Sequence, residues 1–309
     1  MTSESGLLLI DKPEGWTSHD VVAKARGLVG TRKIGHAGTL DPMATGLLVL
    51  GINSATKLLT FIVGATKTYE TTIRLGANTV TDDREGDYLE FADSARLSGL
   101  TDAEISSGVA KLTGRIMQVP SSVSAIKVNG ERAYAKVRGG DEVKLAAREV
   151  EVSRFQPLGE LRRVEVDGHH FVDLDAVIDC SSGTYIRALA RDLGGSLGVG
   201  GHLTALRRTR IGNYSVRQAL TLDSVKKGEV ALLSSANAAR SQFAIRELSA
   251  ADEIDLRHGK RISIGDIADS ERSDEIAAFS ADGRLVAMLT RSGKQLKSLV
   301  VFAEQELSN

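Results

Sequence analysis

The stretch GHAGTLDPMATG, residues 35–46, holds a single carboxylate, Asp41, in a segment rich in glycine and followed at once by Pro42. Glycine and proline at this density favour a turn in the backbone. Basic side chains lie just upstream, His36 among them, and are suited to receive an anionic ligand. The stretch therefore predicts an acid presented on a shaped loop.

The Asp-Pro pair is also typical of a helix start, where Asp caps free amide groups and Pro takes the first helical position. The following residues favour the loop instead. Gly46 would interrupt a helix almost at once, and residues 47–52 form a short apolar run that is typical of a buried strand. We therefore expect Asp41 on a tight connection ahead of a buried strand, where functional side chains often lie.

The chain has 309 residues, room for about two domains, and its 42% hydrophobic residues can fill a sizeable core. No apolar stretch approaches the roughly 20 residues that span a bilayer, and the N-terminus lacks the pattern of a secretory signal. We expect a soluble, cytoplasmic protein with no membrane partner. The single cysteine, Cys180, excludes an internal disulfide framework and a multi-cysteine zinc site, and we expect it to be buried.

The net charge is −1, so a polyanionic partner requires local clusters of basic residues. One such cluster lies between Tyr185 and Arg217, where six arginines face one acid and three of them crowd into residues 207–210. Between Thr79 and Ser107 the balance is reversed, with eight acids against two arginines. Each run is either a solvated face or part of a charged binding surface, and the sequence leaves both interpretations open.

Strand and helix patterns mix without a regular βαβ rhythm, which predicts an α+β fold with a mixed, largely antiparallel sheet over about residues 1–230. The expected strands cover residues 7–10, 47–52, 67–75 and 172–180. Ser18 is the expected cap of one helix, Thr101 and Glu104 form a capping box for a second, and a third is expected around residues 185–193. Asn129-Gly130 is a hairpin-turn signal.

The pattern changes to short strands from Leu248 onward, with a hairpin turn at Asp282-Gly283 and a closing strand at residues 299–302. This predicts a small β-barrel module. We therefore place a larger domain at residues 1–235 and a smaller one at 245–309. Residues 232–240, rich in Ala and Ser, are either a helix or a linker.

Several common motifs are not supported by their context. Residues 194–198 match the G-x-S-x-G pattern of a nucleophile elbow, but a helix precedes Ser196 where that motif needs a strand, so we expect these glycines to end the helix. No dinucleotide fingerprint or Walker A loop can be placed on the chain, and the six histidines form no metal motif. We expect neither a cofactor nor a metal.

Five blocks occur in order along the chain and together resemble the bacterial tRNA pseudouridine synthase B (TruB) family. The blocks are Lys12-Pro13-x-Gly15-x-x-Ser18, GHAGTLDPMATG at residues 35–46, Lys67-x-Tyr69, CSSGTYIR at 180–187 and LRRT at 206–209. One block alone would not be specific, but five in order make chance agreement very improbable. The segment from about Leu248 resembles the PUA RNA-binding domain that many members carry.

The resemblance implies a reaction and a substrate. Uridine 55 in the T-loop of tRNA is isomerised to pseudouridine without a cofactor: the C1′–N1 bond is cut, the uracil turns, and C5 joins C1′. The T-arm of tRNA is the implied partner, and no protein partner is implied. Asp41 is then the essential carboxylate, acting either as nucleophile or as base on the sugar. If Asp41 meets Arg187, as the family suggests, the guanidinium would keep the carboxylate charged.

The same resemblance implies a pocket for an extruded uridine, whose unstacking costs a few kcal/mol. Tyr69 would stack on the uracil and is the candidate to help remove the C5 proton, while Tyr185 and Leu206 would line the pocket. His36 would contact the bases of the loop, and Lys12 would support the site.

Two further segments bear on this resemblance. Asp83, in the acidic run, aligns with a family aspartate near the active site. The chain departs from the family in residues 120–127, PSSVSAIK, where members often carry an aromatic side chain. Roles that the family assigns to this segment are not carried over.

Two other functions fit parts of the pattern. A glycoside or nucleoside hydrolase needs a second carboxylate across the scissile bond, for which Asp83 is the candidate. A non-catalytic RNA-binding or RNA-folding protein would use the arginines and the C-terminal segment, and would survive loss of Asp41. A synthase that also assists tRNA folding would combine two of these functions.

Overall fold

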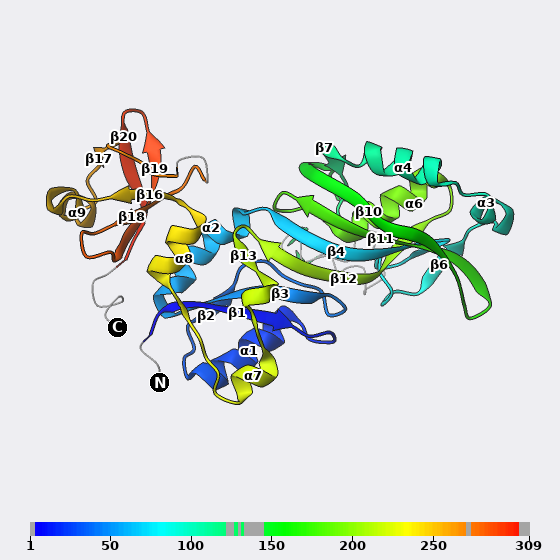
Figure 1. The fold of residues 1–309 in the computed structure, drawn as a ribbon, viewed down its shortest axis with the longest axis horizontal. Coiled ribbons are helices and arrows are strands. Elements are labelled where there is room, and N and C mark those ends of the chain that lie inside the picture. The colour runs from blue at the N-terminus through cyan, green and yellow to red at the C-terminus, as the bar shows by residue number, and fades with distance from the viewer. Residues whose placement is uncertain (1–3, 122–126, 129–130, 133–144, 270–272, 303–309) are drawn as a thin grey trace. The chain divides into compact units, whose positions relative to one another are not determined.

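The computed structural model describes residues 4–121, 127–128, 131–132, 145–269 and 273–302 (Figure 1). Residue contacts divide the chain into two compact units. The first unit holds Met1–Pro42, Gly46–Ala65 and Arg210–Asn309, and the second holds Met43–Thr45 and Thr66–Thr209.

The centre of the first unit is a pair of buried strands, β1 (Gly6–Lys12) and β3 (Thr45–Ile52). They run antiparallel, from Gly6 opposite Ile52 to Lys12 opposite Gly46. Three short strands extend the pair: β2 (Ile34–His36) beside β3, and β14 (Leu220–Thr221) and β15 (Leu233–Ser234) beside β1. The predicted strands at residues 7–10 and 47–52 are confirmed.

Both faces of β1 and β3 are covered, which explains why their apolar residues are continuous rather than alternating with polar ones. Leu8, Ile10, Leu48 and Leu50 pack with α1 (Ser18–Val29), while neighbouring positions such as Leu47 and Val49 face the opposite side. The other elements of this part are η1 (Asn53–Leu58), α2 (Leu59–Gly64), β13 (Tyr214–Ser215), η2 (Val216–Gln218), α7 (Leu222–Lys226) and α8 (Ser235–Gln242). The Ala- and Ser-rich segment at 232–240 therefore ends in a helix.

Helix α1 corrects the predicted cap. Thr17, not Ser18, is the N-cap: its hydroxyl accepts a hydrogen bond from the Asp20 amide, and the Asp20 carboxylate accepts one from the Thr17 amide. Ser18 is the first helical residue and bonds to Leu40 instead. Sequence alone does not distinguish two adjacent hydroxyl residues, because either can cap a helix.

The C-terminal part of the first unit is a curled five-stranded sheet. Its strand order is β16 (Ala244–Glu247), β18 (Ile276–Phe279), β19 (Leu285–Ser292), β20 (Gln295–Val301) and β17 (Ile262–Ser263). Helix α9 (Ala250–Arg257) was not predicted. The hairpin between β18 and β19 turns where expected, and Gly283 takes a left-handed φ of +81° that suits glycine.

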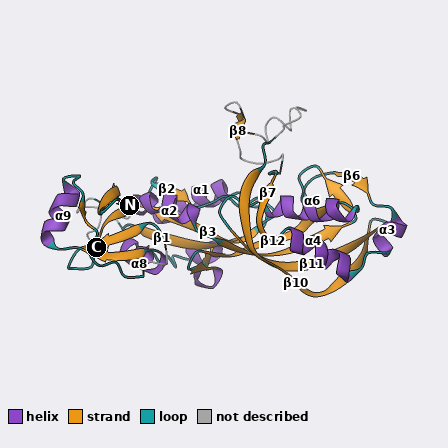
Figure 2. Ribbon diagram, turned by 90° about the horizontal axis from the view of Figure 1, so that it is seen from above, coloured by secondary structure: helices purple, strands orange, loops and turns teal. Residues whose placement is uncertain are grey.

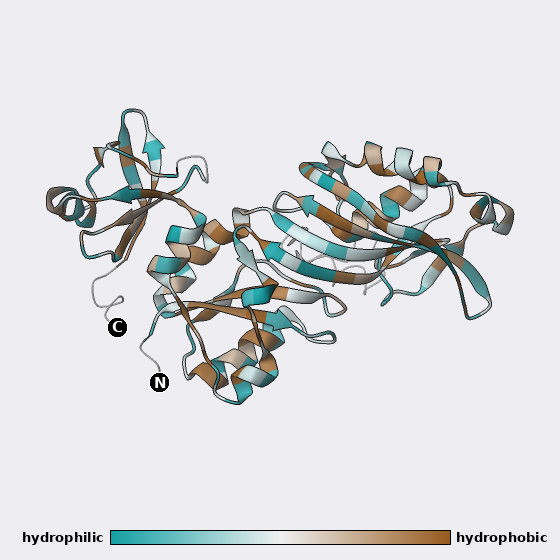
Figure 3. Ribbon diagram, in the orientation of Figure 1, coloured by the Kyte–Doolittle hydropathy of each residue, from teal (hydrophilic) through white to brown (hydrophobic). Residues whose placement is uncertain are grey.

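The second unit is built on long antiparallel strands. The order is β12 (Gly201–Ile211), β4 (Lys67–Leu75), β11 (His169–Cys180), β10 (Arg148–Val166) and β7 (Gly114–Gln118). The β4–β11, β11–β10 and β10–β7 pairs are antiparallel, which confirms the predicted fold class. Figure 3 shows hydrophobic and hydrophilic bands alternating along β10 and β11, as expected where one face of a sheet is buried.

Two helices, α4 (Asp102–Lys111) and α6 (Ile186–Leu197), pack against each other over this sheet (Figure 2). The predicted capping box of Thr101 and Glu104 is confirmed at the start of α4. The remaining elements are β5 (Ala77–Thr79), β6 (Tyr88–Phe91), α3 (Ser94–Ser98), β8 (Lys127–Val128) and β9 (Glu131–Arg132).

Two segments named from the sequence lie wholly or mostly outside the described residues. The turn predicted at Asn129-Gly130 lies outside the described residues, as does most of the departure at 120–127. Within the described ranges, no helix is long and apolar enough to cross a membrane.

Candidate active site

The backbone just before Asp41 is fixed by a buried hydroxyl. Ser18, at the start of α1, accepts a hydrogen bond from the Leu40 amide at 2.8 Å and donates one to the Leu40 carbonyl at 3.1 Å. Ser18 and Leu40 are both buried. A single side chain therefore satisfies both polar groups of the residue that precedes Asp41.

The backbone just after Asp41 is fixed from the other side. The Pro42 carbonyl accepts the Gly15 amide at 2.9 Å and the ammonium of Lys12 at 3.3 Å. Lys12 is fully buried, and its Nζ also donates to the carbonyls of Pro13 and Trp16, at 3.0 and 2.6 Å. The ammonium thus holds the turn after β1 close to the Asp41 loop, because it donates hydrogen bonds to carbonyls of both segments.

Glycine gives this loop its shape. Gly38 and Gly46 have φ values of +92° and +100°, a conformation that an L side chain rarely adopts. The loop leads directly into β3, which is buried along nearly its whole length. Asp41 itself is half-buried. The predicted tight connection ahead of a buried strand is therefore confirmed.

His36 lies at the end of β2, five residues before Asp41. Its ring meets the ring of His19 edge to face, with centroids 5.6 Å apart. His19 is the second residue of α1, so the two histidines join the helix start to the strand that leads into the Asp41 loop.

In the second unit, Tyr69 lies on β4 on the same buried face as Lys67. Burial lowers the pKa of Lys67 to about 8, and the positive charge of Arg208 adds to the shift. Cys180 stands directly opposite Lys67 in the β4–β11 register, and burial raises the pKa of its thiol to about 11. The expectation that Cys180 is a buried residue is confirmed.

Strand β12 carries Leu206, Arg207 and Arg208. Leu206 and Arg208 are buried, with exposed fractions of 7% and 1%, and Arg207 is half-buried. Arg187, on α6, is only 5% exposed. The interpretation of the arginine run as one solvated face is therefore wrong, because two of its six guanidinium groups are in the interior.

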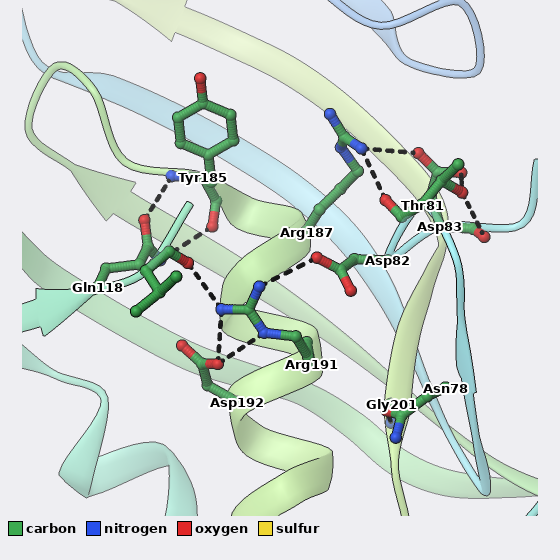
Figure 4. Close-up of polar contacts among 11 residues, drawn as sticks. Asn78, Thr81, Asp82, Asp83, Gln118, Tyr185, Arg187, Arg191, Asp192 and Gly201 are labelled. Atoms are coloured by element: carbon green, nitrogen blue, oxygen red, sulfur yellow. Dashed lines mark hydrogen bonds and ion pairs between the residues drawn. The ribbon is translucent and has the colours of Figure 1, made fainter. Parts of the chain in front are cut away.

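The two arginines of α6 bind consecutive residues of the turn that follows β5 (Figure 4). Arg187 donates to the Thr81 carbonyl at 2.6 Å and lies 3.5 Å from the carboxylate of Asp83, a residue that is only 2% exposed. One helical turn later, Arg191 forms an ion pair with Asp82 at 3.2 Å. Neither of these two ion pairs was predicted from the sequence.

Asp82 is held under strain in this turn. Its φ is +58°, in the left-handed region, and its carboxyl is buried. Burial raises the pKa of Asp82, although a hydrogen bond from the Ser121 side chain and the charge of Arg191 oppose the shift. The acidic run is therefore not a uniform solvated face either, since Asp82 and Asp83 are both buried.

Tyr185 is the N-cap residue of α6 and is half-buried. Its backbone is bound by Gln118 of β7, and the guanidinium of Arg148 lies 5.0 Å from the centre of its ring. Neither Gln118 nor Arg148 was predicted from the sequence. Gln118 is 67 residues from Tyr185, and no local spacing could have indicated the contact.

The predicted site residues thus fall into two groups. Lys12, His36 and Asp41 belong to the first unit, and Tyr69, Asp83, Tyr185, Arg187 and Leu206 to the second. Within the second group, the structure brings Arg187 and Asp83 together. The pairing of Asp41 with Arg187 stays a prediction.

Two other sequence predictions can be compared with the structure. Ser196 lies inside α6, its hydroxyl donates to the Leu193 carbonyl at 2.8 Å, and Gly198 ends the helix with a φ of +70°. This is not a nucleophile elbow, which needs a strand before the serine. Among the described residues, no group of three or more His, Cys, Asp or Glu side chains is placed to hold a metal ion.

Comparison with known proteins gives a consistent result over most of the chain. Residues 26–186 match the TruB family pseudouridylate synthase (N terminal domain), residues 187–246 the tRNA pseudouridylate synthase B C-terminal domain, and residues 243–303 the C-terminal domain of tRNA pseudouridine synthase II. The first match alone covers more than half of the chain.

Relatives named tRNA pseudouridine synthase B are similar along their whole length. The one from Paenarthrobacter aurescens (strain TC1) is 56% identical over 305 residues, covering 97% of this chain and 95% of its own. The one from Thermobifida fusca (strain YX) is 50% identical over 298 residues, covering 96% and 98%.

A solved structure shares the fold. One chain of a Cbf5-Nop10-Gar1 complex aligns with a TM-score of 0.70 at 23% identity, covering 99% of this chain and 87% of that one. At that identity the likeness concerns the fold alone. The family matches and the relatives carry the assignment: the chain belongs to the TruB family of tRNA pseudouridine synthases and is an isomerase.

Proposed function

We propose that this enzyme converts uridine 55, in the T-loop of tRNA, to pseudouridine, with Asp41 as the essential carboxylate. The observation that supports the role of Asp41 is the fixation of its backbone on both sides, by Ser18 at Leu40 and by Lys12 at Pro42. A reacting group that is held in place before substrate binds needs little reorganisation during the reaction.

The proposed reaction conserves every atom of the uracil except one exchangeable hydrogen. The C1′–N1 bond breaks, the freed uracil turns within the site, and a C5–C1′ bond forms. The C5 proton leaves to solvent and N1 ends the reaction carrying a proton, so neither an oxidant nor a cofactor is required. Asp41 takes part as an ionised carboxylate, whether it attacks the sugar or removes a proton from it.

The uridine must leave the stack before Asp41 can reach its glycosidic bond, at a cost of a few kcal/mol. In this proposal Tyr69 stacks on the extruded uracil and helps remove the C5 proton, and Tyr185 and Leu206 line the pocket. His36 contacts bases of the T-loop. Tyr69 and Leu206 are almost fully buried, as suits the walls of a closed pocket.

Arg187 is proposed to hold the Asp41 carboxylate in its charged form, since a neighbouring positive charge favours ionisation. What supports this is the way Arg187 is held by the Thr81 carbonyl and by Asp83, which leaves its long side chain little freedom. Asp83 then acts through Arg187, and Lys12 acts through the Pro42 carbonyl. Neither needs to touch the substrate.

Residues 245–309 are proposed to form an RNA-binding domain of the PUA type beside a catalytic domain at 1–235.

We further propose that the enzyme acts in the cytoplasm, where tRNA is matured, and that it assists tRNA folding while it holds the T-arm. The folding role would persist in Asp41→Asn, because it depends on binding rather than on the carboxylate. Measuring tRNA folding with that variant tests it.

Tritium release from a tRNA transcript that carries 5-tritiated uridine tests the main proposal. The native enzyme should release about one equivalent per tRNA, and Asp41→Asn should release none, while Asp102→Asn, at an exposed helix start, should behave as the native enzyme. A transcript with cytidine at position 55 should release nothing. Release from that transcript would overturn the assignment of position 55, and full release by Asp41→Asn would overturn the role of Asp41.

The two other functions considered from the sequence predict different products. A nucleoside hydrolase would free uracil and leave an abasic site, whereas the proposed reaction leaves the mass of the tRNA unchanged. A protein that only binds RNA would release no tritium at all, and its affinity would fall steeply with salt. Membership of the TruB family favours the isomerase over both.

A further inference from the structure

Helix α6 begins without a cap of its own. Its N-cap residue, Tyr185, makes no side-chain hydrogen bond to the first turn, although helix starts usually carry Ser, Thr, Asp or Asn for that purpose. The φ and ψ of Tyr185 are −100° and 108°, so the chain is extended here and becomes helical at Ile186. Some other group has to fix the point at which the helix begins.

That group is Gln118, the last residue of β7 (Figure 4). Its Oε1 accepts the Tyr185 amide at 2.8 Å, and its Nε2 donates to the Tyr185 carbonyl at 3.0 Å. The carboxamide therefore binds both polar backbone groups of one residue, as a neighbouring strand would. The Gln118 side chain is fully buried, so water does not compete for either bond.

The residue paired with Gln118 on the next strand holds the other end of Tyr185. Arg148 of β10 stands opposite Gln118 in the antiparallel register. Its guanidinium lies 5.0 Å from the centre of the Tyr185 ring, within cation–π range, and also donates to the Gly183 carbonyl. Adjacent strands thus fix the backbone of Tyr185 through Gln118 and its ring through Arg148.

We propose that Gln118 is a positioning residue: its carboxamide sets the place of Tyr185 and the start of α6, and so holds the uridine pocket ready for reaction. This rests on the proposed function, which gives Tyr185 a place in that pocket. Arg187 is two residues further along the same helix start, so a shift at Tyr185 also moves the guanidinium held by Asp83.

The substitution Gln118→Glu tests the two bonds with almost no change of shape. A carboxylate still accepts the Tyr185 amide, but it has no hydrogen to donate to the Tyr185 carbonyl, and the two oxygens repel. A 1 Å displacement in an active site can cost about a hundredfold in rate, so we expect the single-turnover rate constant to fall by at least about tenfold. We expect KM for tRNA to change by less than about threefold, because Gln118 is fully buried and is not proposed to touch tRNA.

A matched control exists in the first unit. Gln242 is also buried, and its Oε1 accepts a backbone amide, that of Asn213, at 2.9 Å. Gln242→Glu therefore introduces the same charge in a similarly buried place without touching the proposed pocket. We expect it to lower the melting temperature while the rate constant, measured well below that temperature, stays within about twofold of the native value.

The pH dependence separates positioning from general damage. Burial raises the pKa of a carboxyl, and once protonated the group introduced by Gln118→Glu has both an acceptor and a donor, like the amide it replaces. The ratio of the variant rate to the native rate should therefore rise as the pH is lowered from about 8 toward 5.5. A loss caused by general disruption of the fold would not be recovered in acid.

Each outcome bears on one of the two proposals. If Gln118→Glu reacts at the native rate at pH 8, or its loss shows no recovery in acid, the positioning role is overturned while the proposed function stands. If the native enzyme does not modify uridine 55, the proposed function is overturned instead. Should Gln118→Glu fail to fold, Gln118→Asn replaces it: that side chain is one methylene too short for both bonds, and a native rate would overturn the proposal.

Discussion

Lys12 is a charged side chain that is fully buried and yet satisfied. An ammonium has three hydrogens to donate, and the carbonyls of Pro13, Trp16 and Pro42 provide three acceptors. These acceptors belong to two segments, the turn after β1 and the loop of Asp41. Lys12 therefore ties the position of the loop that carries Asp41 to the packing of the turn after β1.

Replacing Lys12 by Met should therefore lower both stability and rate. The change removes the donor that the carbonyls of Pro13, Trp16 and Pro42 share, although the Pro42 carbonyl keeps the Gly15 amide. Each lost hydrogen bond costs about 1 kcal/mol, so the free energy of unfolding should fall by about 2–3 kcal/mol. Urea unfolding measures this, with Lys24→Met on the exposed side of α1 as the control that should change little. A Lys12→Met protein as stable as the control would contradict the central role of this ammonium.

Lys67 is buried with a different consequence. Its folded-state pKa of about 8 lies below the usual value near 10.5, so burial disfavours the charged form. The free-energy cost of burying the charged Lys67 ammonium is present in full below pH 8. Between pH 8 and 10.5 the unfolded chain still holds a proton that the folded protein has lost, so the free energy of unfolding rises with pH over this window.

The predicted size of this effect is about 3 kcal/mol, at about 1.4 kcal/mol per pH unit. We expect the stability of the native protein, relative to Lys67→Met, to increase by most of that amount between pH 8 and 10.5. Taking the difference between the two proteins cancels the pH dependence contributed by groups that titrate equally in both. Urea unfolding at several pH values measures it, and a difference that is flat across the window would show that Lys67 has an ordinary pKa.

Single residues also show which parts of the candidate site can be predicted from the sequence and which cannot. The loop of Asp41 was predictable because glycine and proline act locally, and a strongly apolar run has few alternatives to a buried strand. The partners of Arg187 and Tyr185 were not predictable. Asp83 and Gln118 lie 104 and 67 residues away along the chain, and only the folded sheet and helix bring them together.

Among the elements, helix α6 carries the most constraints. It begins at Tyr185, presents Arg187 and Arg191 to the turn at residues 81–83, and approaches the start of β12 so closely that a side chain does not fit between them. A Cβ placed on Gly194 would lie 2.1 Å from the Gly200 carbonyl carbon. The glycines at 194, 195 and 198 were expected from the sequence to end the helix. Gly198 does so, whereas Gly194 and Gly195 lie inside it, and Gly194 permits the close approach.

Two neighbouring glycines allow a sharp comparison. Gly194→Ala should lower the free energy of unfolding by about 3 kcal/mol or more, because backbone rather than a flexible side chain blocks the new methyl group. Gly195→Ala has open space around its Cβ and should raise stability by about 0.5–1 kcal/mol through helix propensity. Urea unfolding of both variants measures the difference. Similar effects at the two positions would mean that α6 and β12 are further apart than described.

At the scale of the whole molecule, the curled C-terminal sheet shares a core with the first strands of the chain. Phe279, Leu285, Met288 and Phe302 pack in the same buried cluster as Leu7, Leu47 and Val49 of β1 and β3. The separate C-terminal domain was predicted from a change in strand pattern, and that pattern contains no information about long-range packing. The boundary at residues 235–245 stays a prediction, but the shared core indicates that the C-terminal sheet supports β3, the strand that follows Asp41.

The shared core predicts that these parts unfold together. Phe302 is fully buried, and Phe302→Ala should cost about 3–5 kcal/mol. Trp16, the single tryptophan, packs beside β1, so its fluorescence follows the N-terminal part. We expect Phe302→Ala to lower the urea midpoint seen by Trp16 and by circular dichroism alike. Exposed Leu299→Ala should leave both in place. An unshifted Trp16 signal, with an earlier transition seen only by circular dichroism, would show that the C-terminal sheet unfolds independently and does not support β3.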